Sequence, residues 1–207
     1  RGRASDDALA AWVGADAARQ FQSTRNAWTG LPHRLYGPAI SILPPGARAG
    51  ALRDAAAAER AARAWLGAHE ALWAGEERPG PGDLALVKSQ RVNATWFLVF
   101  QQRHEGIDVE GGRVDLRLRD DGRLVLFGSD WLPGVTVDTR AARFPRGVSD
   151  ARARLADGFD AARDRALGGE RVVLALPKGD GDLDYRLVDR VRVQTMDPPA
   201  LWRSYVD

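Results

Sequence analysis

The sequence of 207 residues predicts an α+β fold of two consecutive small units, each a helix packed on an antiparallel β-sheet. A helical pattern is followed by several segments in which apolar and polar residues alternate, and this order occurs twice along the chain. The break Leu132-Pro133-Gly134 separates the two occurrences. We therefore expect one domain over residues 1–134 and a second over residues 135–207.

The first unit is predicted to begin with a helix over residues 5–20, capped by Ser5 or Asp6. An extended, turn-rich segment follows over residues 21–43. The strongest helical pattern covers residues 51–74, where alanine is frequent and an apolar stripe repeats at helical spacing. Period-two alternation then predicts antiparallel strands with one wet face, over residues 84–90, 95–103, 113–119 and 123–129.

The second unit is predicted to begin with a helix over residues 150–167, capped by Ser149 and ended by Gly168-Gly169. Its inward positions are Leu155, Phe159, Ala162 and Ala166. Three further strands are expected over residues 171–176, 184–195 and 201–206.

Composition is that of a globular protein, with 44% hydrophobic and 28% charged residues. No apolar run approaches the ~18 residues of a transmembrane helix, so no membrane partner is expected. The absence of cysteine excludes disulfides, thiolate catalysis and cysteine-bound zinc. Net charge is only +2, and arginines alternate with acids, which is typical of solvated faces. We therefore expect no nucleic-acid partner.

A second pattern is the order of residues around the corner between two predicted strands. Gln102, Gly106, Ile107, Val109 and Gly111 read Q-x-x-x-G-I-x-V-x-G. This order resembles the propeptide module that precedes fungalysin-type and thermolysin-type zinc metallopeptidases (the FTP module). Gly122, in the hairpin Asp120-Asp121-Gly122, and Gly128 continue the same order. The glycines would also be expected wherever strands bend and turn, whatever the function.

The closing segment over residues 197–207 resembles the end of a PepSY domain. It carries an aromatic residue, Trp202, and an alternating strand that finishes at Val206-Asp207. Together the two resemblances span residues 20–207 in the order of a metallopeptidase prosegment.

The resemblance implies a protein that is not an enzyme. It would be the prosegment of a secreted zinc metallopeptidase, acting as inhibitor and intramolecular chaperone of its cognate catalytic domain, in cis or after cleavage. A secreted, extracellular or periplasmic location in a bacterium follows from that role. The alternative is a stand-alone secreted or cell-surface PepSY-type protein-binding module without a peptidase.

Residues for chemistry do not form a recognisable constellation in the sequence. His69-Glu70 and His104-Glu105 each begin the zinc motif H-E-x-x-H, but Trp73 and Asp108 stand where its second histidine is needed. No G-x-S-x-G nucleophile elbow occurs. We therefore predict no catalytic residue, no metal site and no cofactor. Residues 179–182 read as a hairpin turn or, as the less favoured alternative, the start of a calcium loop.

The chain has seven tryptophans, most of them with apolar neighbours. Those expected to anchor cores are Trp12, Trp65, Trp73, Trp96, Trp131 and Trp202. Trp28 lies in a turn-rich segment, where local packing is favoured over an interface role.

Overall fold

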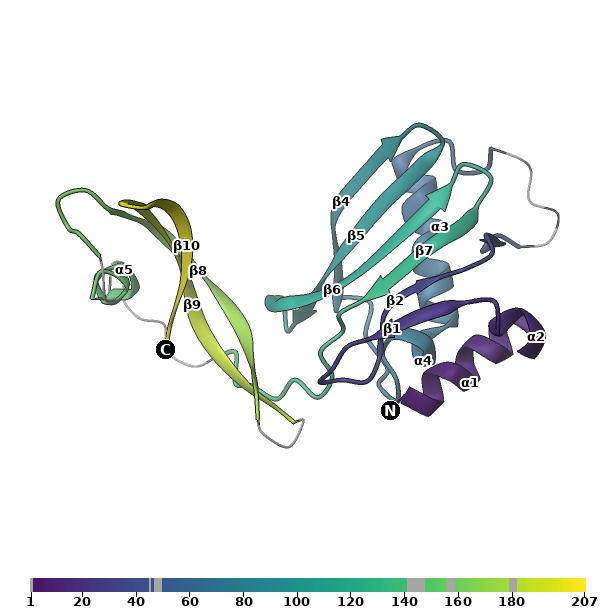
Figure 1. The fold of residues 1–207 in the computed structure, drawn as a ribbon, viewed down its shortest axis with the longest axis horizontal. Helices are drawn as coiled ribbons and strands as arrows, with labels where there is room; N and C mark the ends of the chain where they lie inside the picture. The colour runs from purple at the N-terminus through teal and green to yellow at the C-terminus, as the bar shows by residue number, and fades with distance from the viewer. Residues whose placement is uncertain (1, 45, 47–49, 141–147, 156–158, 179–181) are drawn as a thin grey trace.

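The computed structural model describes residues 2–44, 46, 50–140, 148–155, 159–178 and 182–207 (Figure 1). Its helices are α1 (Gly2–Val13), α2 (Ala15–Ala18), α3 (Ala55–Ala68), α4 (Glu70–Trp73) and α5 (Val148–Ala153). Its strands are β1 (Gln22–Arg25), β2 (Pro32–Tyr36), β3 (Ile40–Ser41), β4 (Leu84–Val92), β5 (Thr95–His104), β6 (Ile107–Arg119), β7 (Arg123–Ser129), β8 (Arg165–Pro177), β9 (Leu183–Met196) and β10 (Pro199–Val206). None of these helices has the length and apolar character needed to span a bilayer.

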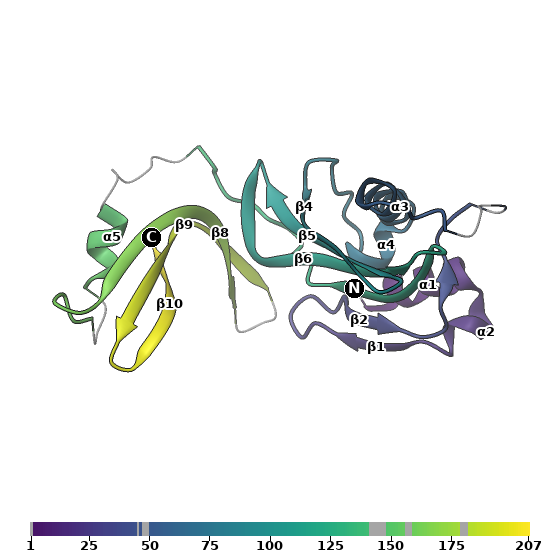
Figure 2. The same cartoon turned by 90° about the horizontal axis from the view of Figure 1, so that it is seen from above.

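The prediction of an α+β fold with two helix-on-sheet units is wrong. Strands dominate the described residues, and they join into one mixed sheet of ten strands, which curls strongly at its β8–β10 end (Figure 2). β6 belongs to both parts of this sheet. Most of it pairs antiparallel with β5 and β7, whereas Val109 near its start pairs in parallel with Val173 of β8. Period-two alternation identifies strands but not a pairing between segments so far apart in sequence.

The helix predicted over residues 150–167 is largely replaced by other structure. α5 ends at Ala153 and β8 already begins at Arg165, while residues 156–158 lie outside the described part. Leu155, which was expected to point inward, is 81% exposed.

Asp164 fixes the path of the chain just before β8. Its carboxylate is buried and accepts hydrogen bonds from the backbone N–H groups of Asp160 (2.9 Å) and Met196 (3.0 Å). These bonds hold the residues before β8 against the end of β9. The sequence predicted helix here, and the structure instead holds Asp164 by a contact with the distant Met196.

The helix predicted over residues 51–74 is present as α3 and α4. The side chain of Asp54 caps α3 by accepting a hydrogen bond from the backbone N–H of Ala57 (2.8 Å). Its buried residues pack on one face of the β4–β7 sheet, in a cluster that includes Ala58, Ala62, Trp65, Leu66, Leu98, Phe100, Leu116 and Phe127. In Figures 1 and 2, α3 lies on one side of these strands, and no described helix covers the other side.

Two smaller hydrophobic clusters belong to the β8–β10 part. One lies under α5 and contains Ala153, Val191, Val193 and Val206. The other joins Val109 and Leu132, from the first predicted domain, to Val173 of β8. The predicted boundary at residue 134 stays a prediction, and residues 141–147 after it lie outside the described part.

Four of the tryptophans expected in cores are buried: Trp65, Trp73, Trp96 and Trp131. Trp12 is half-buried and packs its ring against that of Trp65 at a centroid distance of 5.1 Å. The prediction is wrong for Trp202, which is 56% exposed, and Trp28 is 52% exposed rather than packed. Both exposed rings lie in segments near the margin of the sheet, where one side has no neighbouring strand.

Candidate functional site

Gln102 of the predicted motif binds both backbone polar groups of a single residue. Its side chain is only 2% exposed; Oε1 accepts from the backbone N–H of Leu132 at 2.9 Å, and Nε2 donates to the Leu132 carbonyl at 2.8 Å. The side-chain amide thus pairs with Leu132 in the way that the backbone of a neighbouring strand would. It anchors the chain where it leaves β7 for the β8–β10 part.

Two residues that the sequence interpretation missed support this anchor. A Cβ atom at Gly112 would lie 2.9 Å from Cβ of Gln102, so only glycine leaves room for the buried amide. Gln101 Nε2 donates to the carbonyls of Val109 (2.6 Å) and Gly112 (2.8 Å), across the irregular register where β5 meets β6. Gly111 adopts a φ of +80°, which favours glycine, at the same irregularity. The adjacent glycines 111 and 112 were the available sequence signal.

The rest of the motif forms a turn and a joint. Glu105 and Gly106 have positive φ angles of 48° and 83° in the β5–β6 turn. Val109 is completely buried beside Leu132 and Val173, and Ile107 packs against the same cluster. The structure therefore brings the five corner residues together, and it places them where the two parts of the sheet meet.

The remaining predicted positions are dispersed. Gly122 lies in the β6–β7 turn with a φ of +82°, and a side chain there would overlap Leu43. Val206 is buried in the cluster under α5, whereas Trp202 on the same strand is exposed and donates through Nε1 to Thr195 Oγ1 (3.0 Å). Asp207 forms an ion pair with Arg186 at 3.1 Å. None of these positions adjoins the Gln102 anchor.

Gly128, the last predicted position, belongs to a row of residues across the sheet. Strand register aligns Lys88 of β4, Val99 of β5, Asp115 of β6, Gly128 of β7 and Arg34 of β2. A Cβ atom at Gly128 would lie 2.7 Å from both Arg34 Nη1 and Asp115 Oδ1. The glycine therefore lets Arg34 pass over β7 to reach Asp115, at 3.7 Å.

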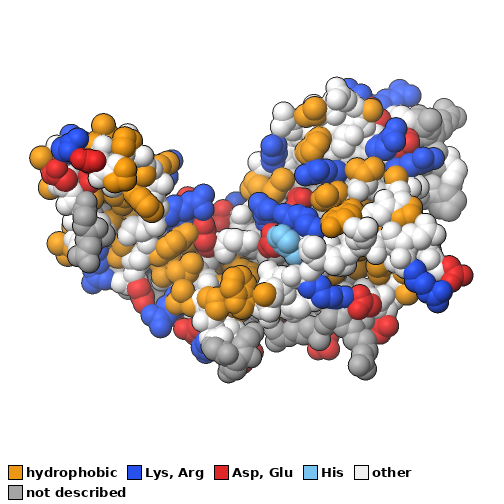
Figure 3. All heavy atoms as spheres, viewed as in Figure 1, with side chains coloured by type: hydrophobic (Ala, Val, Ile, Leu, Met, Phe, Trp, Pro, Cys, Tyr) orange, Lys and Arg blue, Asp and Glu red, His pale blue; other side chains and the backbone are white. Residues whose placement is uncertain are grey.

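This row crosses the side of the β4–β7 sheet that α3 does not cover. Residues of this side line a hollow of about 230 Å³, and we call this surface, with its residues Arg34, Lys88, Phe97, Val99, Arg113, Asp115 and Arg117, the open face. Figure 3 shows Lys and Arg side chains gathered over β4–β7 on this side, next to a hollowed region that separates it from the β8–β10 part. The signal was present in the sequence, because arginine and aspartate alternate with apolar residues over residues 113–119.

Local contacts fix several cations of the open face. Arg113 Nε lies 3.3 Å from Asp130 Oδ2, and Asp130 also contacts His33 Nδ1. The guanidinium of Arg117 lies over the ring of Phe97, 5.2 Å from its centroid. Arginine side chains thereby present donors in fixed positions on a rigid sheet.

A second polar cluster lies around Glu110, at the joint with the β8–β10 part. Its largely buried carboxylate accepts from Arg203 Nη1 (3.0 Å) and the Tyr205 hydroxyl (3.0 Å), and it pairs with Arg190. Burial raises the pKa of Tyr205, and the hydrogen bond to Glu110 raises it further. Because Glu110 lies on β6 and its partners on β9 and β10, this cluster ties the two parts together.

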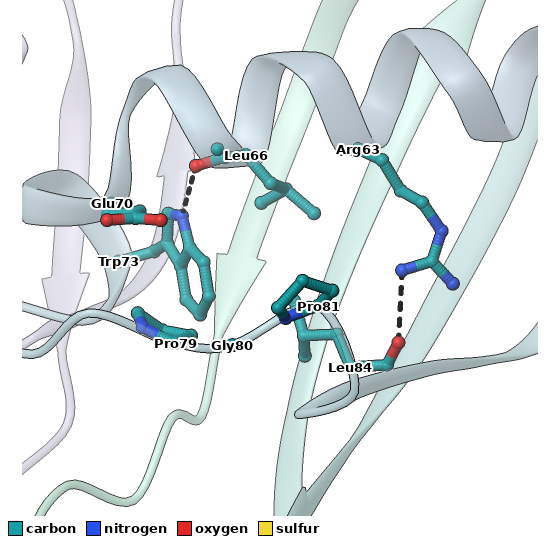
Figure 4. A pocket seen from close by; sticks show the side chains of 9 residues that line it. Arg63, Leu66, Glu70, Trp73, Pro79, Gly80, Pro81 and Leu84 are labelled. Carbon is teal, nitrogen blue, oxygen red and sulfur yellow. Dashed lines mark hydrogen bonds between the residues drawn. The ribbon is translucent and has the colours of Figure 1, made fainter.

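A larger hollow, of about 280 Å³, lies between α3, α4 and the loop over residues 79–81 (Figure 4). The indole of Trp73 lies along it and donates to the Leu66 carbonyl at 3.0 Å. Arg63 at the other end donates to the carbonyl of Leu84 at 3.0 Å. The Trp73 indole N–H and Arg63 Nη1 are thus engaged within the protein, and the walls of this hollow are mainly apolar.

Residues capable of acid–base or metal chemistry are dispersed. The three histidines lie in β2, at the end of α3 and at the end of β5. Burial between Trp12 and Trp65 lowers the pKa of His69. Within the described ranges, no three His, Cys, Asp or Glu side chains are grouped so that they could hold a metal ion. Residues 179–181 of the suggested calcium loop lie outside these ranges.

The sequence matches no protein-family model, and none of the curated proteins compared with it is similar. Among solved structures, the C-terminal domain of YpeB from Bacillus megaterium is similar, with a TM-score of 0.42 and 13% sequence identity. That alignment covers 98% of this chain and 97% of the other. The resemblance to FTP and PepSY modules stays a prediction.

Proposed function

We propose that this chain is a protein-binding module without catalytic activity of its own, and that it binds the catalytic domain of a zinc metallopeptidase. The observation that carries the binding role is the open face, where four basic side chains surround a hollow on a rigid sheet: Arg34, Lys88, Arg113 and Arg117. The choice of a peptidase as partner rests on the motif Q-x-x-x-G-I-x-V-x-G over residues 102–111.

In this proposal the chain inhibits the peptidase by covering part of its surface. A protein interface of standard size buries about 1,600 Å² in total, which is enough for tight binding when the packing is good. If both proteins are first made as one polypeptide, the covalent link raises the effective concentration of each for the other. The module would then hold the peptidase inactive during secretion or in the periplasm, and would assist its folding.

The motif residues have a supporting part in this proposal. Gln102 and Val109 of the motif, together with the neighbouring Gly112, hold the joint between the two parts of the sheet, and none of these three residues is exposed. Their role is to keep the module rigid, so that little conformational freedom is lost on binding.

The test is an inhibition assay with zinc metallopeptidases from the bacterium that produces this chain. Purified chain is titrated against each peptidase, and residual activity on a fluorogenic peptide is measured. We expect stoichiometric inhibition of one of them, with no inhibition by the chain after heat unfolding. Full activity of every such peptidase in a large molar excess of the chain would contradict the prosegment role and favour the stand-alone binding module.

A further inference from the structure

We infer that the open face is the docking surface for an extended, acidic polypeptide segment of the partner protein. This inference rests on the proposed function and names the chemistry that the binding surface recognises. It concerns the side of β4–β7 that lies opposite α3 (Figure 3).

Charge is the first argument. The hollow on the open face is lined by four cations, Arg34, Lys88, Arg113 and Arg117, and by one carboxylate, Asp115. Asp130, which contacts Arg34 at 3.8 Å and Arg113 at 3.3 Å, adds a second negative charge beside it. Arg119 adds a further exposed cation on the same side of β6. The whole chain carries a net charge of only +2, so this side concentrates positive charge that the rest of the molecule balances. Carboxylates are the complementary groups on a protein partner.

Free hydrogen-bonding capacity is the second argument. Arg113 contacts Asp130 through Nε, and its side chain remains 48% exposed. A guanidinium has five N–H donors, so its two terminal nitrogens can still bind a carboxylate of a partner in a bidentate manner. Asp130 fixes the orientation of this side chain, which reduces the entropy lost on binding.

Spacing is the third argument, and it favours an extended ligand. Residues 113, 117 and 119 lie on one side of β6, where positions two apart are separated by about 6.8 Å. An extended peptide has the same repeat, so its acidic side chains can face Arg113, Arg117 and Arg119, with a hydrogen-bond donor at the position opposite Asp115. Phe97 and Val99 add an apolar floor between β4 and β6.

Two features favour a polypeptide over a nucleic acid. Asp115 lies in the middle of the cations and would repel a continuous line of phosphates, whereas a peptide can place a donor opposite it. The ring of Phe97 is covered by Arg117 and is therefore not free to stack on a base.

The experiment measures the binding of a fluorescent poly-L-glutamate of about 20 residues by fluorescence anisotropy at low ionic strength. An extended peptide of this length is long enough to cross the strands β4–β7. The variant carries Arg113→Gln and Arg117→Gln. The matched control carries Arg53→Gln and Arg60→Gln, two exposed arginines on the helix side of the molecule. Each lost arginine–carboxylate contact weakens binding by about two- to fivefold, so we expect the double variant to bind about four- to 25-fold more weakly. The control is expected to bind as the wild type does.

Folding of each variant is checked by circular dichroism. If the first double variant does not fold, Lys88→Gln with Arg119→Gln replaces it, because both side chains are exposed. Equal binding by the surface variant and the control would overturn the inference. Tighter binding of a single-stranded oligonucleotide of equal charge, dependent on the same arginines, would overturn it in favour of a nucleic acid.

Inhibition assays separate this inference from the proposed function. If the surface variant inhibits the peptidase as strongly as the wild type, the docking surface is wrong and the proposed function stands. If poly-L-glutamate binding depends on Arg113 and Arg117 but no peptidase is inhibited, the docking surface stands and the proposed function is wrong.

Discussion

Gln102 and Leu132 are joined by two hydrogen bonds, of 2.8 and 2.9 Å, in which one buried amide side chain satisfies both backbone groups of the other residue. The contact links the middle of the sheet to the first residues of the connection toward β8. Val109 and Val173 pack beside it. This buried amide therefore acts together with the Val109–Val173 contact and the Glu110 cluster in placing the two parts of the sheet relative to each other.

Gln102→Ala is expected to destabilise the protein by about 2–4 kcal/mol, because two buried backbone groups of Leu132 lose their partners. Urea unfolding followed by tryptophan fluorescence measures the loss, and limited proteolysis after residue 132 reports loosening of the connection. Gln90→Ala, at an exposed position of β4, is the control and is expected to change little. If Gln102→Ala lowers the free energy of unfolding by no more than Gln90→Ala does, then water can satisfy the backbone groups of Leu132 in place of the amide.

Gly112→Ala tests the space needed by the same anchor. The added methyl group would lie 2.9 Å from Cβ of Gln102, so the amide must move from Leu132, with an expected cost of about 1–3 kcal/mol. Gly67→Ala in α3 meets nothing within 4 Å and is expected to stabilise by about 0.5–1 kcal/mol, because alanine favours helix. The two variants should thus move the urea midpoint in opposite directions; movement in the same direction would contradict the steric argument.

The lowered pKa of His69 predicts that the protein loses stability in mild acid. Burial lowers its pKa in the folded state from the ordinary value of 6.5, so the unfolded chain binds the proton more readily. The contribution of the neutral His69 to the free energy of unfolding is fully present above pH 6.5. It is lost as the pH falls from 6.5 toward the lower pKa of His69 in the folded state. His69→Phe keeps an aromatic ring between Trp12 and Trp65 without the titration. The free energy of unfolding, measured between pH 5 and pH 8, should fall less in the variant; equal falls would contradict this assignment.

Glu110→Gln tests the polar cluster at the joint. Removing the charge leaves the largely buried Arg190 with Glu170 alone, and we expect a loss of about 1–3 kcal/mol. The pKa of Tyr205 should also fall toward its ordinary value of 10.0 but remain above it, because burial still raises it. Tyrosinate absorbance during alkaline titration measures this change, with Tyr205→Phe to assign the signal. An unchanged titration would show that Glu110 does not contact the hydroxyl in solution.

Trp73 and Trp202 give opposite expectations for the same substitution. Trp73 is buried and packs on Trp131 at a centroid distance of 5.1 Å, so Trp73→Ala should cost about 3–5 kcal/mol. Trp202 is exposed on β10, so Trp202→Ala should cost less than about 1 kcal/mol. Thermal unfolding of both variants checks the contrast. A large loss of stability in Trp202→Ala would contradict the exposed position of Trp202 and support the prediction from its apolar neighbours that it packs in a core.

Local patterns identified much of the first part of the fold. Alanine content and the apolar stripe located α3, alternation located the strands from β4 to β7, and Gly122 marked the hairpin between β6 and β7. These features depend on residues close together in the chain. The corner around Gly106 was also visible, because positive φ angles select for glycine.

Other features depend on contacts between distant segments, and only the tertiary structure decided them. The pairing of β6 with β8 joins Val109 to Val173, and the carboxylate of Asp164 accepts a hydrogen bond from the backbone N–H of the distant Met196. The open face likewise combines Arg34 of β2 with Asp115 of β6, because strand register aligns them across Gly128. Sequence periodicity states which residues share a side of a strand; which strands lie side by side follows from the packing of the whole chain.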